Sequence, residues 1–241
     1  MQSPEVAEKF ERYIRNIPNL HSWDGGVTWN AGGFSATHLR TICELLRSNP
    51  ERARVLETGA GNSTVCFLLA GASEVTSIAP DESLFDRIAD YCRQNGIDLG
   101  PLRTVVSLSE TALPAIAAEA TRDKKPIDFA LLDGGHGWPT VFVDFCYTYA
   151  MLRQGGWMMI DDIQLHSVKE LARFMMKAWQ FELVSNLQKS LIFRKTTDQQ
   201  MFGDFGGQPY IMERTEEDAA AGRAYVIPHV RADARQVRSG E

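Results

Sequence analysis

Two short apolar runs, each ending in carboxylates, constrain the fold of this chain more than any other feature. Residues 127–132 are followed by Asp133, and residues 157–160 are followed by the acid pair Asp161 and Asp162. The segment between the runs is long enough to cross over a sheet as a helix, so we expect two parallel strands. The carboxyl ends of parallel strands share one edge. Grouping like charges there has an electrostatic cost, which is typical of a functional site.

The same alternation of strand-like and helix-like segments extends from residue 54 to residue 179. This order predicts an α/β fold with a parallel sheet and helices on both faces. The two final runs are joined only by a tight turn at Gln188 and Lys189, which predicts an antiparallel hairpin at one edge. The seven expected strands are residues 54–57, 74–79, 103–107, 129–132, 157–160, 181–186 and 191–194. The expected helices are 64–70, 81–95, 110–120 with a break near Pro114, 140–152 and 168–179.

The ends of the chain follow different patterns from its centre. Residues 4–16 have a helical pattern, and Ser35 is expected to cap a second helix that extends to about residue 47. Between them lies a loop rich in glycine that also contains Trp23 and Trp29. These two tryptophans could form a wall for a substrate or a lid over the core. We expect an N-terminal helical substrate or lid region at 1–50, a core at 51–196 and a polar C-terminal appendage at 197–241. The appendage is either an ordered arm or a partly disordered tail.

Composition narrows the classes of partner. The net charge of −6 argues against nucleic acid as the main partner. No apolar run approaches the roughly 18 residues of a membrane span, so we expect no membrane partner. The four cysteines form no Cys-x-x-Cys pair, which favours reduced, packed thiols over a zinc site. The first residues lack a secretory pattern, so we expect a cytoplasmic protein. A homo-oligomer is left open.

A glycine-containing turn lies between the first expected strand and the helix after it. Its sequence, Glu-Thr-Gly-Ala-Gly-Asn-Ser-Thr at residues 57–64, would let the backbone approach a nucleotide-like ligand at the carboxyl end of the sheet. A dinucleotide fingerprint needs glycine where this chain has Thr64, and an acid about 20 residues on, near Ala79. The pattern for a nicotinamide cofactor is therefore weak. A purely structural turn in another α/β protein is the alternative.

The strand-Glu-x-Gly-x-Gly pattern resembles motif I of class I S-adenosylmethionine (SAM)-dependent methyltransferases. The resemblance covers residues 54–195 and implies a Rossmann-like fold that ends in an antiparallel hairpin, as the pattern of strands also predicts. In that family the turn contacts SAM, which assigns SAM-binding roles to Glu57, Gly59, Gly61, Asn62, Ser63 and Thr64.

The resemblance has one departure, at the end of the second strand. The family has an acid there that binds the ribose hydroxyls, whereas this chain has Ala79, and Asp81 lies two residues later. Asp81 is the candidate to reach the ribose from the following turn. After the third strand, Ser109 is our candidate for the adenine contact.

The strand-end acids and the histidine three residues after Asp133 resemble metal-dependent O-methyltransferases, including the catechol type and sugar-modifying enzymes of antibiotic pathways. The resemblance implies that Asp133, Asp161 and Asp162 bind a metal and that His136 is the catalytic base, with Asp133 also in contact with SAM. An oxygen-bound cation lowers the pKa of an acceptor hydroxyl, and an imidazole can accept its proton. Three carboxylates without a soft ligand favour Mg²⁺, with Mn²⁺ or Ca²⁺ as substitutes.

Each of these residues also has a simpler interpretation. Asp133 could contact only SAM, Asp162 could cap a helix, and His136 could only hydrogen-bond its own loop. We therefore expect a SAM-dependent O-methyltransferase that uses Mg²⁺ and acts on a small hydroxylated molecule of sugar or natural-product type. The alternatives are a metal-free N- or O-methyltransferase and a non-catalytic SAM-binding protein or oxidoreductase of Rossmann type.

Overall fold

The computed structural model describes residues 4–22, 24–49, 52–199, 201 and 207–222. The chain forms two compact units, Met1–Asp198 and Gln199–Glu241, which we describe separately. Trp23 and residues 223–241 of the expected appendage lie outside the described residues. Within the described part of the chain, no helix is long and apolar enough to cross a membrane.

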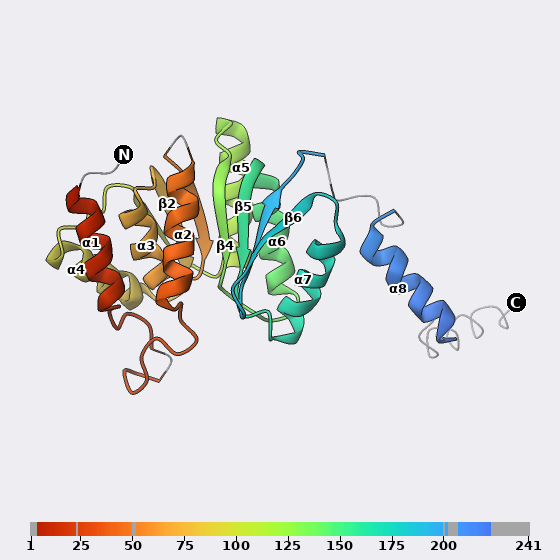
Figure 1. Ribbon diagram of the computed structural model, residues 1–241, viewed down its shortest axis with the longest axis horizontal. Helices are drawn as coiled ribbons and strands as arrows, with labels where there is room; N and C mark the ends of the chain where they lie inside the picture. The colour runs from red at the N-terminus through yellow and green to blue at the C-terminus, as the bar shows by residue number, and fades with distance from the viewer. Residues whose placement is uncertain (1–3, 23, 50–51, 200, 202–206, 223–241) are drawn as a thin grey trace, which may run out of the picture. The chain divides into compact units, whose positions relative to one another are not determined.

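The first unit is built on one seven-stranded sheet with the order β3-β2-β1-β4-β5-β7-β6 (Figure 1). Strands β1 to β5 are parallel, and β7 pairs antiparallel with both β5 and β6. This confirms the predicted fold, including the final hairpin. The strands are β1 (Arg54–Thr58), β2 (Glu74–Ala79), β3 (Leu102–Val106), β4 (Ile127–Leu132), β5 (Leu152–Ile160), β6 (Phe181–Asn186) and β7 (Leu191–Lys195).

Helices cover both faces of the sheet because its central strands are apolar on both sides. On one face, Phe67 of α3 packs against Phe129 of β4, with 5.7 Å between ring centroids. On the other, Phe145 of α6 packs against Phe181 of β6 at 6.0 Å. Ser35 caps α2 as predicted, since its hydroxyl accepts a hydrogen bond from the backbone N–H of His38. The helices of this unit are α1 (Pro4–Arg15), α2 (Ala36–Ser48), α3 (Asn62–Ala70), α4 (Glu82–Gln94), α5 (Ser109–Asp123), α6 (Thr140–Met151) and α7 (His166–Lys177).

Two local predictions were wrong. Helix α5 runs through Pro114 without a break. The exposed Pro114 is the sixth residue of this helix and removes one backbone hydrogen-bond donor, but the helix continues past it to Asp123. Strand β5 begins at Leu152, directly after α6, rather than at Trp157. Its register against β4 shifts near the start, where the positive φ of Gly155 accommodates the irregularity.

The second unit contains one element among its described residues. Helix α8 (Pro209–Ala220) lies in the segment expected to be a polar appendage, and the sequence pattern did not indicate it. The helix has no buried residues.

Candidate functional site

A cavity of about 640 Å³ lies at the carboxyl ends of the parallel strands. The strand ends are in register, because Thr58 of β1 pairs with Ile78 of β2 and with Leu132 of β4, which in turn pairs with Ile160 of β5. A volume of this size is within the usual range for a small-molecule site. The cavity is lined by residues after each of β1, β2, β3, β4 and β5, and by part of the N-terminal segment.

The glycine turn after β1 forms one wall of this cavity. Gly59 has a φ of +90°, and a Cβ atom there would lie 2.3 Å from the carbonyl oxygen of Asp133. Only glycine fits between the two strand ends, so the turn leaves bare backbone facing the cavity. The hydroxyl of Tyr13 in α1 donates a hydrogen bond of 2.7 Å to the carbonyl of Asn62 and fixes the start of α3. Gly59, Gly61, Asn62 and Ser63 line the cavity, as expected for a ligand-binding turn.

Glu57 lies behind the turn and does not line the cavity. Its carboxylate is fully buried and accepts hydrogen bonds from the hydroxyls of Ser63, Thr64 and Ser77, at 2.6, 2.5 and 2.5 Å. Burial raises the pKa of Glu57 to about 7 despite these bonds. The side chain of Glu57 therefore stabilises the turn through hydrogen bonds on the side away from the cavity. Thr64, one of its partners, is also buried.

Asp81 and Ser109 both line the cavity, at the ends of β2 and β3. Asp81 also caps α4, since it accepts bonds from the backbone N–H of Ser83 at 2.9 Å and from Arg87 at 3.1 Å. The hydrogen bonds with Ser83 lower the pKa of Asp81. Ser109 is buried at the start of α5. Ribose and adenine contacts by these residues stay predictions.

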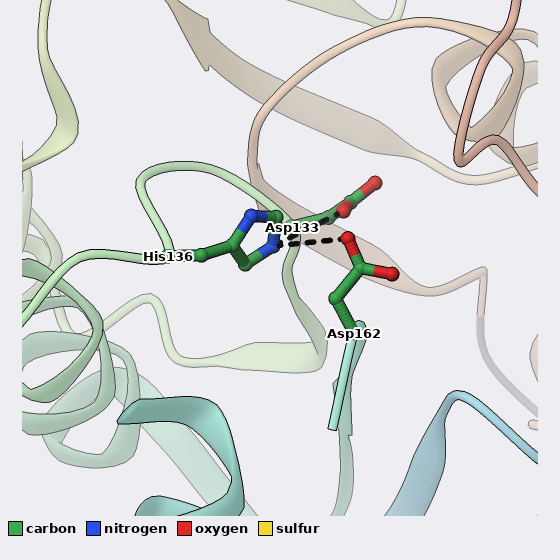
Figure 2. Close-up of side chains that lie close together, drawn as sticks. All are labelled: Asp133, His136 and Asp162. Carbon is green, nitrogen blue, oxygen red and sulfur yellow. Dashed lines mark ion pairs between the residues drawn. The ribbon is translucent and has the colours of Figure 1, made fainter. Parts of the chain in front are cut away.

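The acids after β4 and β5 meet the histidine at the other end of the cavity. Figure 2 shows the imidazole of His136 pointing toward the carboxylates of Asp133 and Asp162. The Nε2 atom of His136 lies 3.6 Å from Asp133 Oδ1 and 3.8 Å from Asp162 Oδ2. One ligand atom from each of the three residues lies within 4.8 Å of the others. The arrangement can hold a cation or exchange a proton.

The Nε2 atom of His136 is buried, and no described residue is within hydrogen-bond range of it. Its backbone is fixed, since the hydroxyl of Ser167 donates to the carbonyl of His136. The contact with Asp133 raises the pKa of His136 above its ordinary value. Enclosure raises the pKa of Asp133, and the neighbouring carboxylate of Asp161 acts in the same direction. A buried nitrogen without a partner, between two carboxylates, is a place for a ligand.

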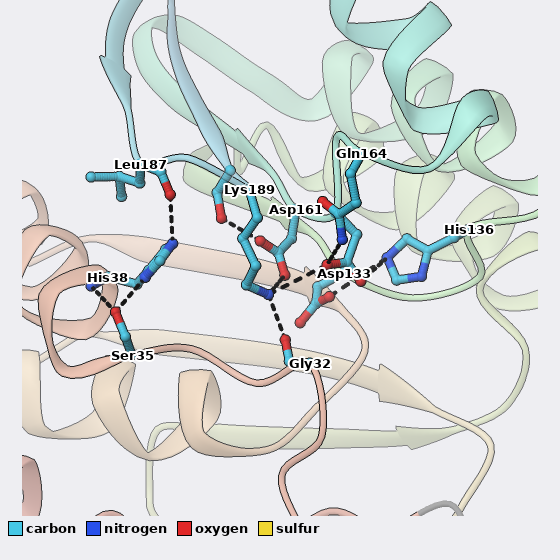
Figure 3. A network of polar contacts seen from close by, with 11 residues as sticks. Gly32, Ser35, His38, Asp133, His136, Asp161, Gln164, Leu187 and Lys189 are labelled. Carbon is cyan, nitrogen blue, oxygen red and sulfur yellow. Dashed lines mark hydrogen bonds and ion pairs between the residues drawn. The ribbon is translucent and has the colours of Figure 1, made fainter.

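Asp161 points away from this group. Its fully buried carboxylate accepts bonds from the hydroxyl of Ser190 and from the ammonium group of Lys189, the latter at 2.5 Å (Figure 3). The backbone of Asp162 has a φ of +57°, a conformation that Asp tolerates better than most residues, and this turns consecutive side chains in different directions. The structure thus brings together three of the four residues predicted at this sheet edge. A role for Asp161 in metal binding stays a prediction.

The alternative interpretation of Asp162 as a helix cap is wrong. Helix α7 begins at His166 with Leu165 at its N-cap, and Asp162 instead accepts a bond of 2.9 Å from the side chain of Gln164. Its other oxygen faces His136. The side chain is therefore available to the cavity, which it lines.

The N-terminal loop supplies the wall of the cavity next to the acid pair. Its fold is organised by Asn30, whose side-chain oxygen accepts bonds from the backbone N–H groups of Leu20 and His21, at 3.2 and 3.3 Å. Residues 30–34 line the cavity, whereas Trp29 does not. The two tryptophans were expected to form a wall for a substrate or a lid over the core, and Trp23 lies outside the described residues.

Lys189 is the residue at this site that sequence reasoning missed. It lies in the β6–β7 turn, which was predicted, but no spacing motif links that turn to acids 27 and 28 residues away. A lysine in a hairpin turn is usually solvated, so nothing in the sequence separates this one from others. Its partners became visible only in the folded chain.

The fold and the site together define a class. A parallel sheet that ends in an antiparallel β7, with a glycine turn after β1 at the cavity, is the fold of class I SAM-dependent methyltransferases. A sequence model of a methyltransferase domain matches residues 56–163. Residues 56–163 therefore match a methyltransferase domain, which agrees with the predicted resemblance to class I SAM-dependent methyltransferases. No curated protein matches the chain in sequence.

Solved structures share the fold at low sequence identity. The O-methyltransferase TomG from Streptomyces achromogenes, solved with SAM and involved in tomaymycin synthesis, aligns with a TM-score of 0.56 and 15% identity, over 82% of this chain and 92% of that one. The methyltransferase PaMTH1 from Podospora anserina, bound to S-adenosylhomocysteine (SAH), aligns with 0.56 and 12% identity, over 81% and 89%. MycE from the mycinamycin pathway, solved with Mg and SAH, aligns with 0.50 and 16% identity, over 83% and 57%.

Proposed function

We propose that this chain transfers the methyl group of SAM to a hydroxyl group of a small molecule, of sugar or natural-product type, with the help of a divalent cation. One observation carries the proposal. The Nε2 of His136, which has no hydrogen-bond partner among the described residues, lies between the carboxylates of Asp133 and Asp162, in the cavity that the neighbouring glycine turn also lines. The turn and these three residues would thus contact a donor and an acceptor held in the same cavity.

The cavity residues fit SAM. The backbone at Gly59 faces the cavity without a Cβ, and Asp81 and Ser109 line the same cavity along the ends of β2 and β3. SAM supplies a sulfonium-bound methyl group that is already electrophilic. The chain therefore has to orient the acceptor and remove its proton, and both tasks fall to residues at the far end of the cavity.

The acidic end fits a hard divalent cation. Asp133 and Asp162 offer carboxylate oxygens, which Mg²⁺ prefers, and no soft ligand is present in the group. When bound, the ion would lower the pKa of an acceptor hydroxyl. MycE, which shares the fold, was solved with Mg, SAH and mycinamycin VI, and TomG is an O-methyltransferase.

His136 is the residue that would accept the proton. Its Nε2 faces the cavity end without a partner among the described residues, and Asp133 stabilises the imidazolium that forms on proton transfer. The same nitrogen could instead bind the ion as a third ligand. The two roles predict different effects of His136→Gln. Loss of a base lowers turnover and leaves Mg²⁺ affinity unchanged, whereas loss of a ligand lowers both.

A metal-free methyltransferase is the second candidate, and Lys189 is the observation that favours it. Its ammonium group already lies 2.5 Å from Asp161 and 3.4 Å from Asp162, so part of the acidic charge is balanced without an ion. In that case the remaining acids would face the acceptor itself.

Two measurements test the proposal. Calorimetry with SAH tests the cofactor, and no binding would refute a SAM-dependent function. Transfer of labelled methyl groups from SAM to a panel of hydroxylated sugars and phenols tests the acceptor class. Activity lost in a chelator and restored by Mg²⁺ supports the metal, whereas equal activity in the chelator supports the metal-free candidate.

A further inference from the structure

The turn of the β6–β7 hairpin is joined to the N-terminal segment at two points (Figure 3). The first joins α2, where Nε2 of His38 lies 3.0 Å from the carbonyl oxygen of Leu187. The second is the ammonium group of Lys189, which donates a bond of 2.5 Å to the carbonyl of Gly32 and lies 5.0 Å from the ring centre of Phe34. Gly32 and Phe34 both line the cavity.

The same ammonium group is anchored on the acid pair. It donates to Asp161 at 2.5 Å and lies 3.4 Å from Asp162. An ammonium group has three N–H donors, and here three acceptors surround it, two carboxylates and the carbonyl of Gly32. Asp161 is fully buried and needs a compensating charge, so the position of Lys189 is fixed from that side.

We infer that Lys189 is a positioning residue: its charge, anchored on Asp161 and Asp162, holds the loop at residues 30–34 in place as the wall of the cavity next to the acids. The role of that wall in binding an acceptor rests on the proposed function, whereas the tether itself does not. Because Asp162 faces Lys189 with one oxygen and His136 with the other, the tether joins the wall directly to the group of candidate catalytic residues.

A loss of this charge should loosen the loop and leave the sheet unchanged. Two backbone amides report the order of the loop, because Asn30 donates to the carbonyl of His21 at 2.7 Å and Gly33 donates to the carbonyl of Asn30 at 2.9 Å. Both flank Gly32, the residue that Lys189 holds. We expect their exchange with solvent deuterium to become roughly tenfold faster or more when the charge-assisted bond is lost.

Lys189→Met alone would leave the carboxylate of Asp161 buried without a counter-charge, which could prevent folding. The deciding variant is therefore Lys189→Met combined with Asp161→Asn, which removes both charges and keeps an acceptor for Ser190. Lys169→Met is the control for replacing a lysine elsewhere in the fold, since Lys169 is an exposed residue of α7; the double variant itself leaves the net charge unchanged.

Hydrogen exchange read by mass spectrometry on the full chain tests the inference. Faster exchange in peptides that cover residues 24–36 of the double variant, with β1 and β4 and the control unchanged, supports it. Unchanged exchange in those peptides overturns it, as does an equal acceleration in β1 and β4, which would mean a general loss of stability. SAH binding by the wild type, measured in parallel, tests the proposed function separately.

Discussion

The substitution Glu57→Gln removes a negative charge from beneath the glycine turn and keeps the size of the side chain nearly unchanged. The wild-type carboxylate is fully buried and accepts three hydroxyl hydrogen bonds, and its pKa is raised from an ordinary 4.5 to about 7, mainly by burial. At about 1.4 kcal/mol for each tenfold change in proton affinity, the ionised form costs about 3 kcal/mol in the folded chain. The glutamine side chain is neutral at every pH and carries no such cost.

The sign of the pH dependence follows from the raised pKa. The folded chain binds the proton of Glu57 more tightly than the unfolded chain does. The stability contribution of Glu57 is therefore fully present below pH 4.5 and is lost as the pH rises through about 7. We expect the free energy of unfolding of the wild type, relative to Glu57→Gln, to fall by about 3 kcal/mol between pH 4.5 and pH 8.

Urea unfolding followed by tryptophan fluorescence, repeated across this pH range for both proteins, measures the difference. Other buried acids titrate in both proteins and cancel to first order. Glu119→Gln is a suitable control. Glu119 is half-exposed and paired with Arg103, which lowers the pKa of Glu119. The contribution of Glu119 to stability is therefore lost as the pH falls, which is the opposite direction. A difference between wild type and Glu57→Gln that is constant with pH would refute the reasoning.

Three further predictions concern the cavity. Gly59→Ala should lower stability by roughly 1–3 kcal/mol and abolish SAH binding by calorimetry, because a Cβ would lie 2.3 Å from the carbonyl oxygen of Asp133 at a φ of +90°. His136→Gln should lower turnover by roughly 100-fold and leave SAH affinity unchanged. The turnover of the wild type should rise as the pH passes through the raised pKa of His136, and the variant should lack this rise. An unchanged pH profile would contradict the role of His136 as base. Asp162→Asn should weaken Mg²⁺ binding, measured by calorimetry, by at least about 10- to 100-fold. That is the usual cost of losing a residue that only supports a metal ligand, and a ligand itself should cost no less. Unchanged affinity would contradict a role for Asp162 as ligand.

The sheet could be predicted from sequence because its strands leave a strong pattern. Central parallel strands are buried on both faces, so β4 is apolar except for Asp128, and β1 is buried from Val55 to Thr58 and followed by the glycine turn. The starts of elements were less predictable. Residues 152–156 contain two glycines and an arginine, which disfavour a strand, yet they form the start of β5, where Leu152 pairs with Ile127 of β4 before the register shifts. Pairing across the sheet decided their conformation, and a local pattern does not contain that information.

The same limit applies at the site. Position along a strand predicted that Asp133, Asp161 and Asp162 would share one edge of the sheet, because the strands are parallel. It could not predict the direction of each side chain, which depends on the positive φ of Asp162 and on partners from the β6–β7 turn. Lys189 has no motif that marks it as part of a site, so its contact with both acids of the pair, and the orientation of Asp162 toward His136, required the folded chain.

The charges at the cavity support a cationic ligand. Three carboxylates gather at this end, and the ammonium group of Lys189 balances one of them, that of the buried Asp161. Asp133 and Asp162 then carry two negative charges between them while His136 is neutral. Both face Nε2 of His136, so their mutual repulsion is relieved when positive charge enters between them. A proton on His136 supplies one charge, and a divalent ion supplies two. Under the proposed function, the ion would help to keep the imidazole neutral, as a base requires, which joins the cation and the base into one proposal.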